Sequence, residues 1–206
     1  MITIVDYGMG NLRSVQKGFE KVGLPAEITR EPRRILEADG VVLPGVGAFG
    51  RCMENLALYN LLEVIKAVIN EDRPFLGICL GLQLLFEESE EFGPVKGLGI
   101  LAGKVVKFNE SLGLKIPHMG WNSIEKVGDC SMLQGILSGD FFYFVHSFYV
   151  VPASIGSIAA KATYGAEFAA AVQRGNLFAC QFHPEKSGKV GLKILENFGR
   201  LCEGNL

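Results

Sequence analysis

A single cysteine stands between two glycines in the stretch GICLGLQLLF, residues 77–86. Cys79 has Gly77 two positions before it and Gly81 two positions after it, at the end of an apolar run. This spacing is typical of a nucleophile elbow, a tight strand-to-helix turn that lifts one side chain clear of a sheet. We therefore predict that Cys79 is a catalytic nucleophile. A buried cysteine at an ordinary glycine-rich junction explains this motif in isolation equally well.

The surroundings of Cys79 predict how its sulfur is activated. A helical pattern follows it, and the positive end of a helix dipole favours a thiolate over a thiol. The backbone N–H of Leu80 would then face an oxyanion. A second glycine-rich turn, PGVGAFG at 44–50, would supply another oxyanion donor through Val46 or Gly47. A simple tight turn is an equally good explanation of PGVG alone.

A thiolate that attacks a carboxamide needs a proton donor for the leaving nitrogen, and histidine is the usual one. Of His118, His146 and His183, the last lies in CQFHPEKS after an apolar run, with Glu185 two positions on. Residues i and i+2 of an extended segment project to the same side, so Glu185 can hold the imidazole in one tautomer. We predict a triad with Cys79 at the strand ends where α/β proteins bind ligands. A strand-end histidine beside a solvated glutamate would be the better explanation if His183 stood alone.

Other ligand classes fit the sequence poorly. The histidines are far apart, and there is no CxxC or HxxxH spacing that would indicate a metal site. The stretch YGMGNLR at 7–13 has Arg13 where a dinucleotide fingerprint requires its third glycine. We therefore expect neither a metal nor a cofactor.

The elements that position these residues have the pattern of an α/β protein. Apolar runs at 2–5, 40–45 and 74–79 are followed by helical spacings, which is typical of strands buried on both faces of a parallel sheet. The spacing predicts a helix over 12–22 with Asn11 as its N-cap, a second helix over 56–69 and a C-terminal helix over 190–202. Short strand-like runs between about 98 and 183, with a hairpin at 174–176, predict an antiparallel part. The predicted fold is an open, mostly parallel sheet flanked by helices, with an antiparallel extension in the C-terminal half, in a single domain over residues 1–206.

Composition excludes several classes of protein. The chain has 206 residues, of which 49% are hydrophobic and 20% charged, and its net charge is -2. These values disfavour disorder and binding to nucleic acid. The start MITIVDYGMG has the pattern of a buried strand and not of a signal peptide, and no apolar stretch approaches the roughly 18 residues that span a membrane. Five scattered cysteines do not form a disulfide framework. We expect a cytoplasmic protein with no membrane partner.

Several motifs together resemble the class I glutamine amidotransferases. GICLGLQLLF and QFHPEKS carry the general pattern, and PGVGAF, PHMGWN (117–122) and YFVHSF (143–148) are similar to the glutaminase subunits of imidazole glycerol phosphate synthases. The resemblance covers essentially the whole chain, from DYGMGNL onward, and implies a flavodoxin-like fold. The chain departs from the family at Leu82, where methionine is frequent, and at Phe148, where tyrosine is frequent.

The resemblance implies a reaction and a role for each residue of the triad. Cys79 would attack the side-chain amide of L-glutamine to form a thioester. His183 would protonate the departing ammonia and then activate water, while Glu185 orients the imidazole.

The resemblance also implies residues that bind the substrate. Gln83 and Glu91 would hold its polar groups, with help from Gly47 and from the backbone of Ser147 and Phe148. A solvated helix face is the alternative for Gln83 and Glu91, and the acidic run EESEE favours that alternative for Glu91.

The partner implied by the family is a (β/α)8-barrel cyclase subunit, which receives the ammonia and makes imidazole glycerol phosphate and AICAR in histidine biosynthesis. The residues of matching motifs that would lie at this heterodimer interface are Asn11, Met119, Trp121, Tyr143 and Lys186. A core tryptophan, a strand tyrosine and a solvated lysine are the alternatives. A related subunit for surface-sugar amination, a non-catalytic scaffold that docks on a barrel, and a cysteine peptidase are the rival functions.

Overall fold

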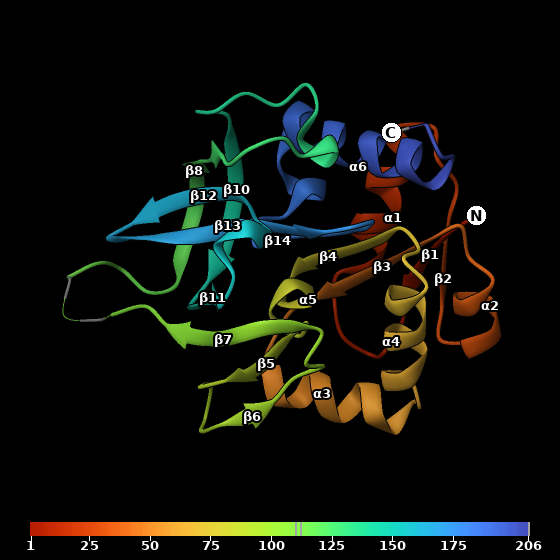
Figure 1. Cartoon of the computed structure of the whole chain (residues 1–206), viewed down its shortest axis with the longest axis horizontal. Helices are drawn as coiled ribbons and strands as arrows, with labels where there is room; N and C mark the ends of the chain where they lie inside the picture. Colours follow the sequence, from red (N-terminus) through yellow and green to blue (C-terminus); the bar gives the residue numbers. More distant parts are fainter. Residues whose placement is uncertain (110, 112, 206) are drawn as a thin grey trace.

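The computed structural model describes residues 1–109, 111 and 113–205. Its centre is a sheet with the strand order β2-β1-β3-β4-β14-β13-β12-β9 (Figure 1). The parallel part consists of β1 (Ile2–Val5), β2 (Ala26–Thr29), β3 (Gly40–Gly45), β4 (Phe75–Cys79) and β14 (Leu177–Cys180). The antiparallel continuation consists of β13 (Ala166–Arg174), β12 (Ile158–Tyr164) and β9 (Glu125–Lys126). The predicted fold class is confirmed.

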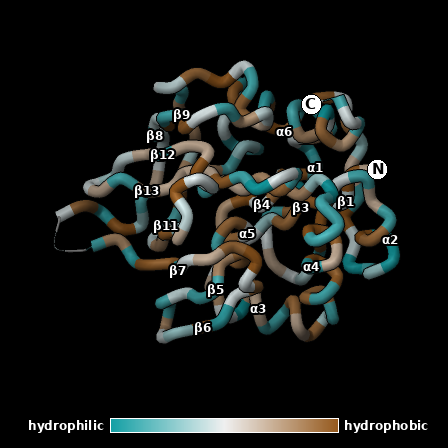
Figure 2. The backbone as a smooth tube through the Cα atoms, in the orientation of Figure 1, coloured by the Kyte–Doolittle hydropathy of each residue, from teal (hydrophilic) through white to brown (hydrophobic). Residues whose placement is uncertain are grey.

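Helices cover both faces of this sheet. One face carries α1 (Leu12–Lys21) and α6 (Gly188–Cys202), and the other carries α2 (Pro32–Leu36), α3 (Phe49–Leu58) and α4 (Leu62–Asn70). Successive side chains of a strand alternate between the two cores: Val42 packs on the α1 and α6 side, and Val41 and Leu43 pack on the other. The central strands are therefore mainly apolar, and Figure 2 shows them as a hydrophobic centre between more hydrophilic outer segments.

Two smaller sheets complete the fold. A ribbon pairs β10 (Phe141–His146) with β8 (His118–Ser123), and a second sheet has the order β11-β7-β5-β6. Its strands are β11 (Phe148–Pro152), β7 (Leu101–Lys107), β5 (Phe86–Ser89) and β6 (Val95–Lys96). Short 3-10 turns are η2 (Ser131–Leu133), η3 (Ile155–Ser157) and η4 (Pro184–Lys186). The apolar run 141–151 breaks at Ser147, so its halves enter different sheets and the break lies beside the end of β4.

Some predicted elements have different boundaries in the structure. The hairpin is confirmed, because Arg174 pairs with Leu177 across Gly175 and Asn176. The single helix predicted over 56–69 is wrong. Two helices, α3 and α4, occupy this region, because Asn60 takes a positive φ of 57° that ends the first. Asn11 stands at the N-cap of α1, but its side chain makes no capping hydrogen bond.

The helix predicted after Cys79 is also shorter than its pattern indicates. α5 spans only Leu80–Gln83, and the chain then enters β5, which pairs with β7 and β6. Pairing with these strands outweighs the local helical spacing. A single helical turn has little dipole, so most of the predicted activation of the sulfur by a helix N-terminus is lost. Every helix in the described part of the chain is too short or too polar to span a lipid bilayer.

Candidate active site

Cys79 occupies a strained turn at the end of β4. Its φ of 56° and ψ of -109° lie outside the regions that residues with a side chain normally adopt. The two flanking glycines are required by close packing. A Cβ at Gly81 would lie 1.9 Å from the carbonyl oxygen of Leu43, and one at Gly77 would lie 2.9 Å from the Cβ of Ala179. The predicted nucleophile elbow therefore has a geometric basis in the neighbouring strands.

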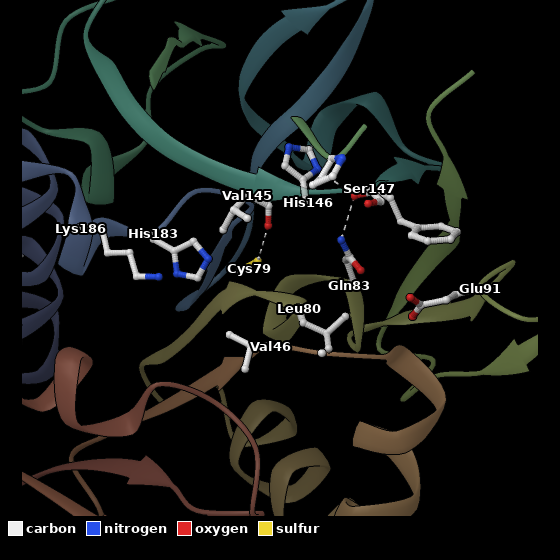
Figure 3. Close-up of a pocket in the computed structure, with 13 residues that line it drawn as sticks. Val46, Cys79, Leu80, Gln83, Glu91, Val145, His146, Ser147, His183 and Lys186 are labelled. Carbon is white, nitrogen blue, oxygen red and sulfur yellow. Dashed lines mark hydrogen bonds between the residues drawn. The ribbon is translucent and has the colours of Figure 1, made fainter. Parts of the chain in front are cut away.

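The turn opens on a cavity of about 340 Å³, a size within the range of small-molecule sites. Figure 3 shows the cavity wall formed by the ends of several elements. The predicted catalytic, oxyanion and substrate-binding residues that line it are Val46, Gly47, Cys79, Leu80, Gln83, Glu91, Ser147, Phe148 and His183. The remaining wall is formed by Pro117, Val145, His146 and Lys186.

His183 and Glu185 form a buried pair at this cavity. Nδ1 of His183 lies 2.8 Å from Oε1 of Glu185, and the two side chains are only 3% and 1% exposed. Glu185 lies behind the imidazole and does not line the cavity itself. Nε2 of His183 has no hydrogen-bond partner among the described residues, and the ring lies beside Cys79 (Figure 3). The free ring nitrogen is thus available to exchange a proton within the cavity.

The electrostatic environment favours a protonated imidazole. Burial by itself lowers the pKa of His183, but the negative charge of the neighbouring Cys79 sulfur, together with the charge and hydrogen bond of the Glu185 carboxylate, raises it to about 10. A protonated imidazole beside a thiolate is the state that a nucleophilic cysteine requires.

Hydrogen bonds to β10 hold the histidine segment in place. The backbone N–H of His183 donates to the carbonyl of Tyr143 at 2.9 Å, and the backbone N–H of Tyr143 donates to Oγ of Ser187 at 2.9 Å. The Ser187 hydroxyl in turn donates to the carbonyl of His183 at 2.6 Å. The serine of HPEKS therefore closes the turn that carries the histidine and glutamate.

Two side chains brace the glycine turn that follows β3. The Tyr7 hydroxyl donates to the carbonyl of Pro44 at 2.8 Å, and the Cys52 thiol donates to the carbonyl of Val46 at 3.6 Å. Burial raises the pKa of Cys52 to about 11, so this group remains a thiol that can donate. Gly47 follows with a φ of 91°, which favours glycine. The YGMGNLR stretch thus contributes a tyrosine that supports the predicted oxyanion turn.

The two side chains predicted to bind substrate are not on a solvated helix face. Gln83 is 4% exposed, and its Nε2 donates to the carbonyl of Phe148 at 2.9 Å and to Oε1 of Gln181 at 3.0 Å. Glu91 lies beyond β5, where its Oε2 accepts a hydrogen bond of 2.6 Å from the backbone N–H of Phe49 at the start of α3. Both residues line the cavity, as a substrate-binding role requires, and that role stays a prediction.

Sequence reasoning did not single out Gln181. This residue is fully buried, and its Nε2 donates to Sγ of Cys79 at 3.7 Å. The available signal was its place two residues before His183 in QFHPEKS.

A buried histidine pair is a second feature that the sequence did not indicate. His118 and His146 are paired across β8 and β10, with 2.9 Å between Nδ1 of the first and Nε2 of the second. Nδ1 of His146 donates to the carbonyl of Phe148 at 2.8 Å. Burial lowers the pKa of His118 to about 4 and that of His146 to about 3, so both rings are neutral at neutral pH. No local signal links these two positions, because their contact depends on strand register.

The predicted interface residues lie mainly beside the cavity. Met119 is 59% exposed and Trp121 is 56% exposed, so the alternative of a core tryptophan is wrong. The rings of Trp121 and Tyr143 are 6.2 Å apart, and Nζ of Lys186 lies 5.9 Å from the tyrosine ring. Asn11 is also exposed but lies on a separate element, at the start of α1.

Histidine, cysteine and carboxylate side chains do not gather into a group of three or more that could hold a metal ion anywhere within the described residues.

Comparisons with known proteins agree with the fold and with the motifs. A model of the family "Glutamine amidotransferase class-I" matches residues 3–201. The imidazole glycerol phosphate synthase subunit HisH of Syntrophotalea carbinolica is 56% identical and covers 97% of this chain and 99% of its own. The subunit of the same name from Methanocaldococcus jannaschii is 52% identical and covers 98% of this chain and 100% of its own.

Solved structures share the fold at lower identity. A crystal structure of a glutamine amidotransferase has a TM-score of 0.75 at 19% identity and covers 97% of this chain and 100% of its own. The family match extends over almost the whole chain, and the relatives are more than half identical to it. The chain therefore belongs to the class I glutamine amidotransferases, among the HisH subunits of imidazole glycerol phosphate synthases.

Proposed function

We propose that this chain is the glutaminase subunit of an imidazole glycerol phosphate synthase and supplies ammonia for histidine biosynthesis. The observation that carries the proposal is the meeting of the Cys79 elbow with the buried His183–Glu185 pair at one cavity. The strong similarity to HisH subunits favours this function over the amination of surface sugars.

The geometry supports a two-step hydrolysis. The Cys79 thiolate attacks the side-chain carbonyl carbon of glutamine, and the carbonyl oxygen becomes an oxyanion. The protonated His183 gives its Nε2 proton to the leaving nitrogen, so ammonia departs and a thioester remains. The neutral imidazole then takes a proton from water, which attacks the thioester and releases glutamate and the sulfur. Glu185 holds the imidazole in one tautomer throughout.

We also propose roles for the other residues that line the cavity. Backbone N–H groups at Leu80 and at the turn of Val46 and Gly47 stabilise the oxyanion. Gln83 and Glu91 bind the polar groups of glutamine, with the backbone of Ser147 and Phe148. The support for these roles is that all of these residues line the cavity.

The proposed partner is a (β/α)8-barrel cyclase subunit that docks over this face in a heterodimer. Ammonia in water at neutral pH is mostly protonated, so its transfer requires a covered path. Met119 and Trp121 expose apolar surface, and the Trp121 ring lies 6.2 Å from that of Tyr143. Tyr143 is next to Lys186, which lines the cavity, and this supports a docking face beside the cavity. Exposed aromatic and methionine side chains suit the core of such an interface. Asn11 is proposed as a further contact.

Replacing the nucleophile tests the proposal. In the reconstituted pair of subunits, Cys79→Ala should abolish synthesis that uses glutamine and retain synthesis that uses added ammonium salt. Retained ammonia-dependent synthesis shows that the loss lies in the glutaminase step and not in the cyclase. Continued release of glutamate by this variant would exclude the thioester mechanism, and failure of the wild-type pair to convert the pathway ribonucleotide would exclude the assigned synthase.

A further inference from the structure

We propose that Gln181 is a positioning residue for the nucleophile: its side-chain amide donates a hydrogen bond to the sulfur of Cys79 and stabilises the thiolate. The inference deepens the proposed glutaminase function and rests on Cys79 being its nucleophile. Gln181 does not line the cavity, so it acts on glutamine only through its neighbours there, the Cys79 sulfur and the Gln83 amide, and alkylation of Cys79 reports on the first of these.

The direction of this hydrogen bond follows from a chain that starts at a backbone carbonyl. The carbonyl oxygen of Phe148 can only accept, so Gln83 must turn its NH2 group toward it at 2.9 Å. The second N–H of that amide then points to the Gln181 oxygen at 3.0 Å. With its oxygen engaged, Gln181 presents its own NH2 group to Sγ of Cys79 at 3.7 Å. Each link orients the next, and the sulfur can only be the acceptor of the last.

The residues of this hydrogen-bond chain are largely shielded from water: Gln181 is 0% exposed, Gln83 4% and Cys79 6%. The backbone of Gln181 is also held in place, because its N–H donates to the carbonyl of Ala170 at 2.8 Å. A donor that is already oriented, at a site with little exposure to water, interacts strongly with an anion.

The other neighbour of the sulfur favours the opposite protonation state. Sγ of Cys79 lies 3.8 Å from the carbonyl oxygen of Val145, which can accept a hydrogen bond from a thiol but repels a thiolate (Figure 3). Gln181 is therefore the side chain that supports the sulfur once its proton has passed to His183. This separates its role from that of the imidazole, which carries the proton.

Alkylation of the isolated full-length chain by iodoacetamide tests this role without glutamine turnover or a partner. The rate at Cys79 is followed by mass spectrometry from about pH 5 to pH 10, because only the thiolate reacts. Gln181→Met keeps the length of the side chain and removes the donor. We expect its alkylation midpoint to move upward by about one pH unit, with a rate roughly tenfold lower below the midpoint. Gln181→Glu, which keeps the size and replaces the donor by an oxygen, should shift in the same direction.

Gln173→Met is the matched control, since Gln173 lies on β13 and its amide donates only a long 3.4 Å bond to the carbonyl of Gly175. Its profile should coincide with that of the wild type. Unshifted midpoints in both Gln181 variants would overturn the inference, as would an equal loss of rate at every pH, which would indicate altered access alone. If the wild-type pair shows no glutaminase activity, the proposed function fails while the alkylation midpoints still decide the role of Gln181.

Discussion

Replacing Glu185 by glutamine tests how far the buried carboxylate supports the catalytic histidine. The change keeps the shape of the side chain and removes its charge. The carboxylate lies 2.8 Å from Nδ1 of His183, and both side chains are almost fully buried, so water cannot replace the lost interaction. A hydrogen bond to a charged group of this kind contributes about 2 kcal/mol. If this hydrogen bond stabilises the imidazolium that forms when Cys79 loses its proton, the variant hydrolyses glutamine roughly 30-fold more slowly.

A second effect acts in the same direction. The carboxylate can only accept a hydrogen bond, whereas a glutamine amide can also donate one to Nδ1 and so favour the wrong tautomer of His183. We therefore treat 30-fold as the lower end of the expected loss. The pKa of His183 should also fall, because the carboxylate is one of the groups that raise it. Glutamate release by the reconstituted pair measures the rate, and an NMR titration of the ring measures the pKa.

The matched control is Glu196→Gln, which removes the same charge from an exposed carboxylate on α6 that pairs with Lys193 and Arg200. That variant should retain wild-type glutaminase activity. Ammonia-dependent synthesis should survive in both variants, since it bypasses the triad. A Glu185→Gln variant that is folded, docks normally and hydrolyses glutamine within about twofold of the wild-type rate would refute the assigned role of the carboxylate.

Two further predictions concern stability. Gly81→Ala would place a Cβ 1.9 Å from a backbone carbonyl oxygen of β3, so we expect its free energy of unfolding in urea to fall by about 3 kcal/mol or more. The control is Gly156→Ala, whose Cβ would lie 3.6 Å from its nearest neighbour and whose free energy of unfolding should change little. A Gly81→Ala variant as stable as the wild type would contradict the packing argument. The pKa of His118 in the folded state, about 4, lies below its unfolded value of about 6.5, so the native state binds fewer protons and stability falls as the pH drops through this window. The difference in free energy of unfolding between wild type and His118→Gln should therefore fall by about 3 kcal/mol from pH 7 to pH 4. A difference that does not change with pH would show that the ring has an ordinary pKa in the folded protein.

Local sequence patterns were sufficient for the parts of the site that lie within a few residues of one another. The two glycines around Cys79 predicted the elbow, because the packing that requires them acts directly on the turn. The predicted contact between His183 and Glu185 is present at 2.8 Å, but the segment forms the turn η4 and not the extended strand from which the i, i+2 argument started. The apolar runs of β1, β3 and β4 predicted the parallel sheet, since strands covered on both faces are apolar at nearly every position.

Long-range pairing decided the rest. The residues after Gln83 have helical spacing, but available partners in β6 and β7 make them a strand. The register that places Cys180 beside Ile78 brings Gln181 and His183 next to Cys79 across about a hundred positions of chain. A sequence lists which donors and acceptors exist, whereas hydrogen bonds depend on ångström distances that only the packed sheet determines. That is why the motifs were sufficient to predict the nucleophile and its histidine, while the amide that orients the sulfur became visible only in the tertiary structure.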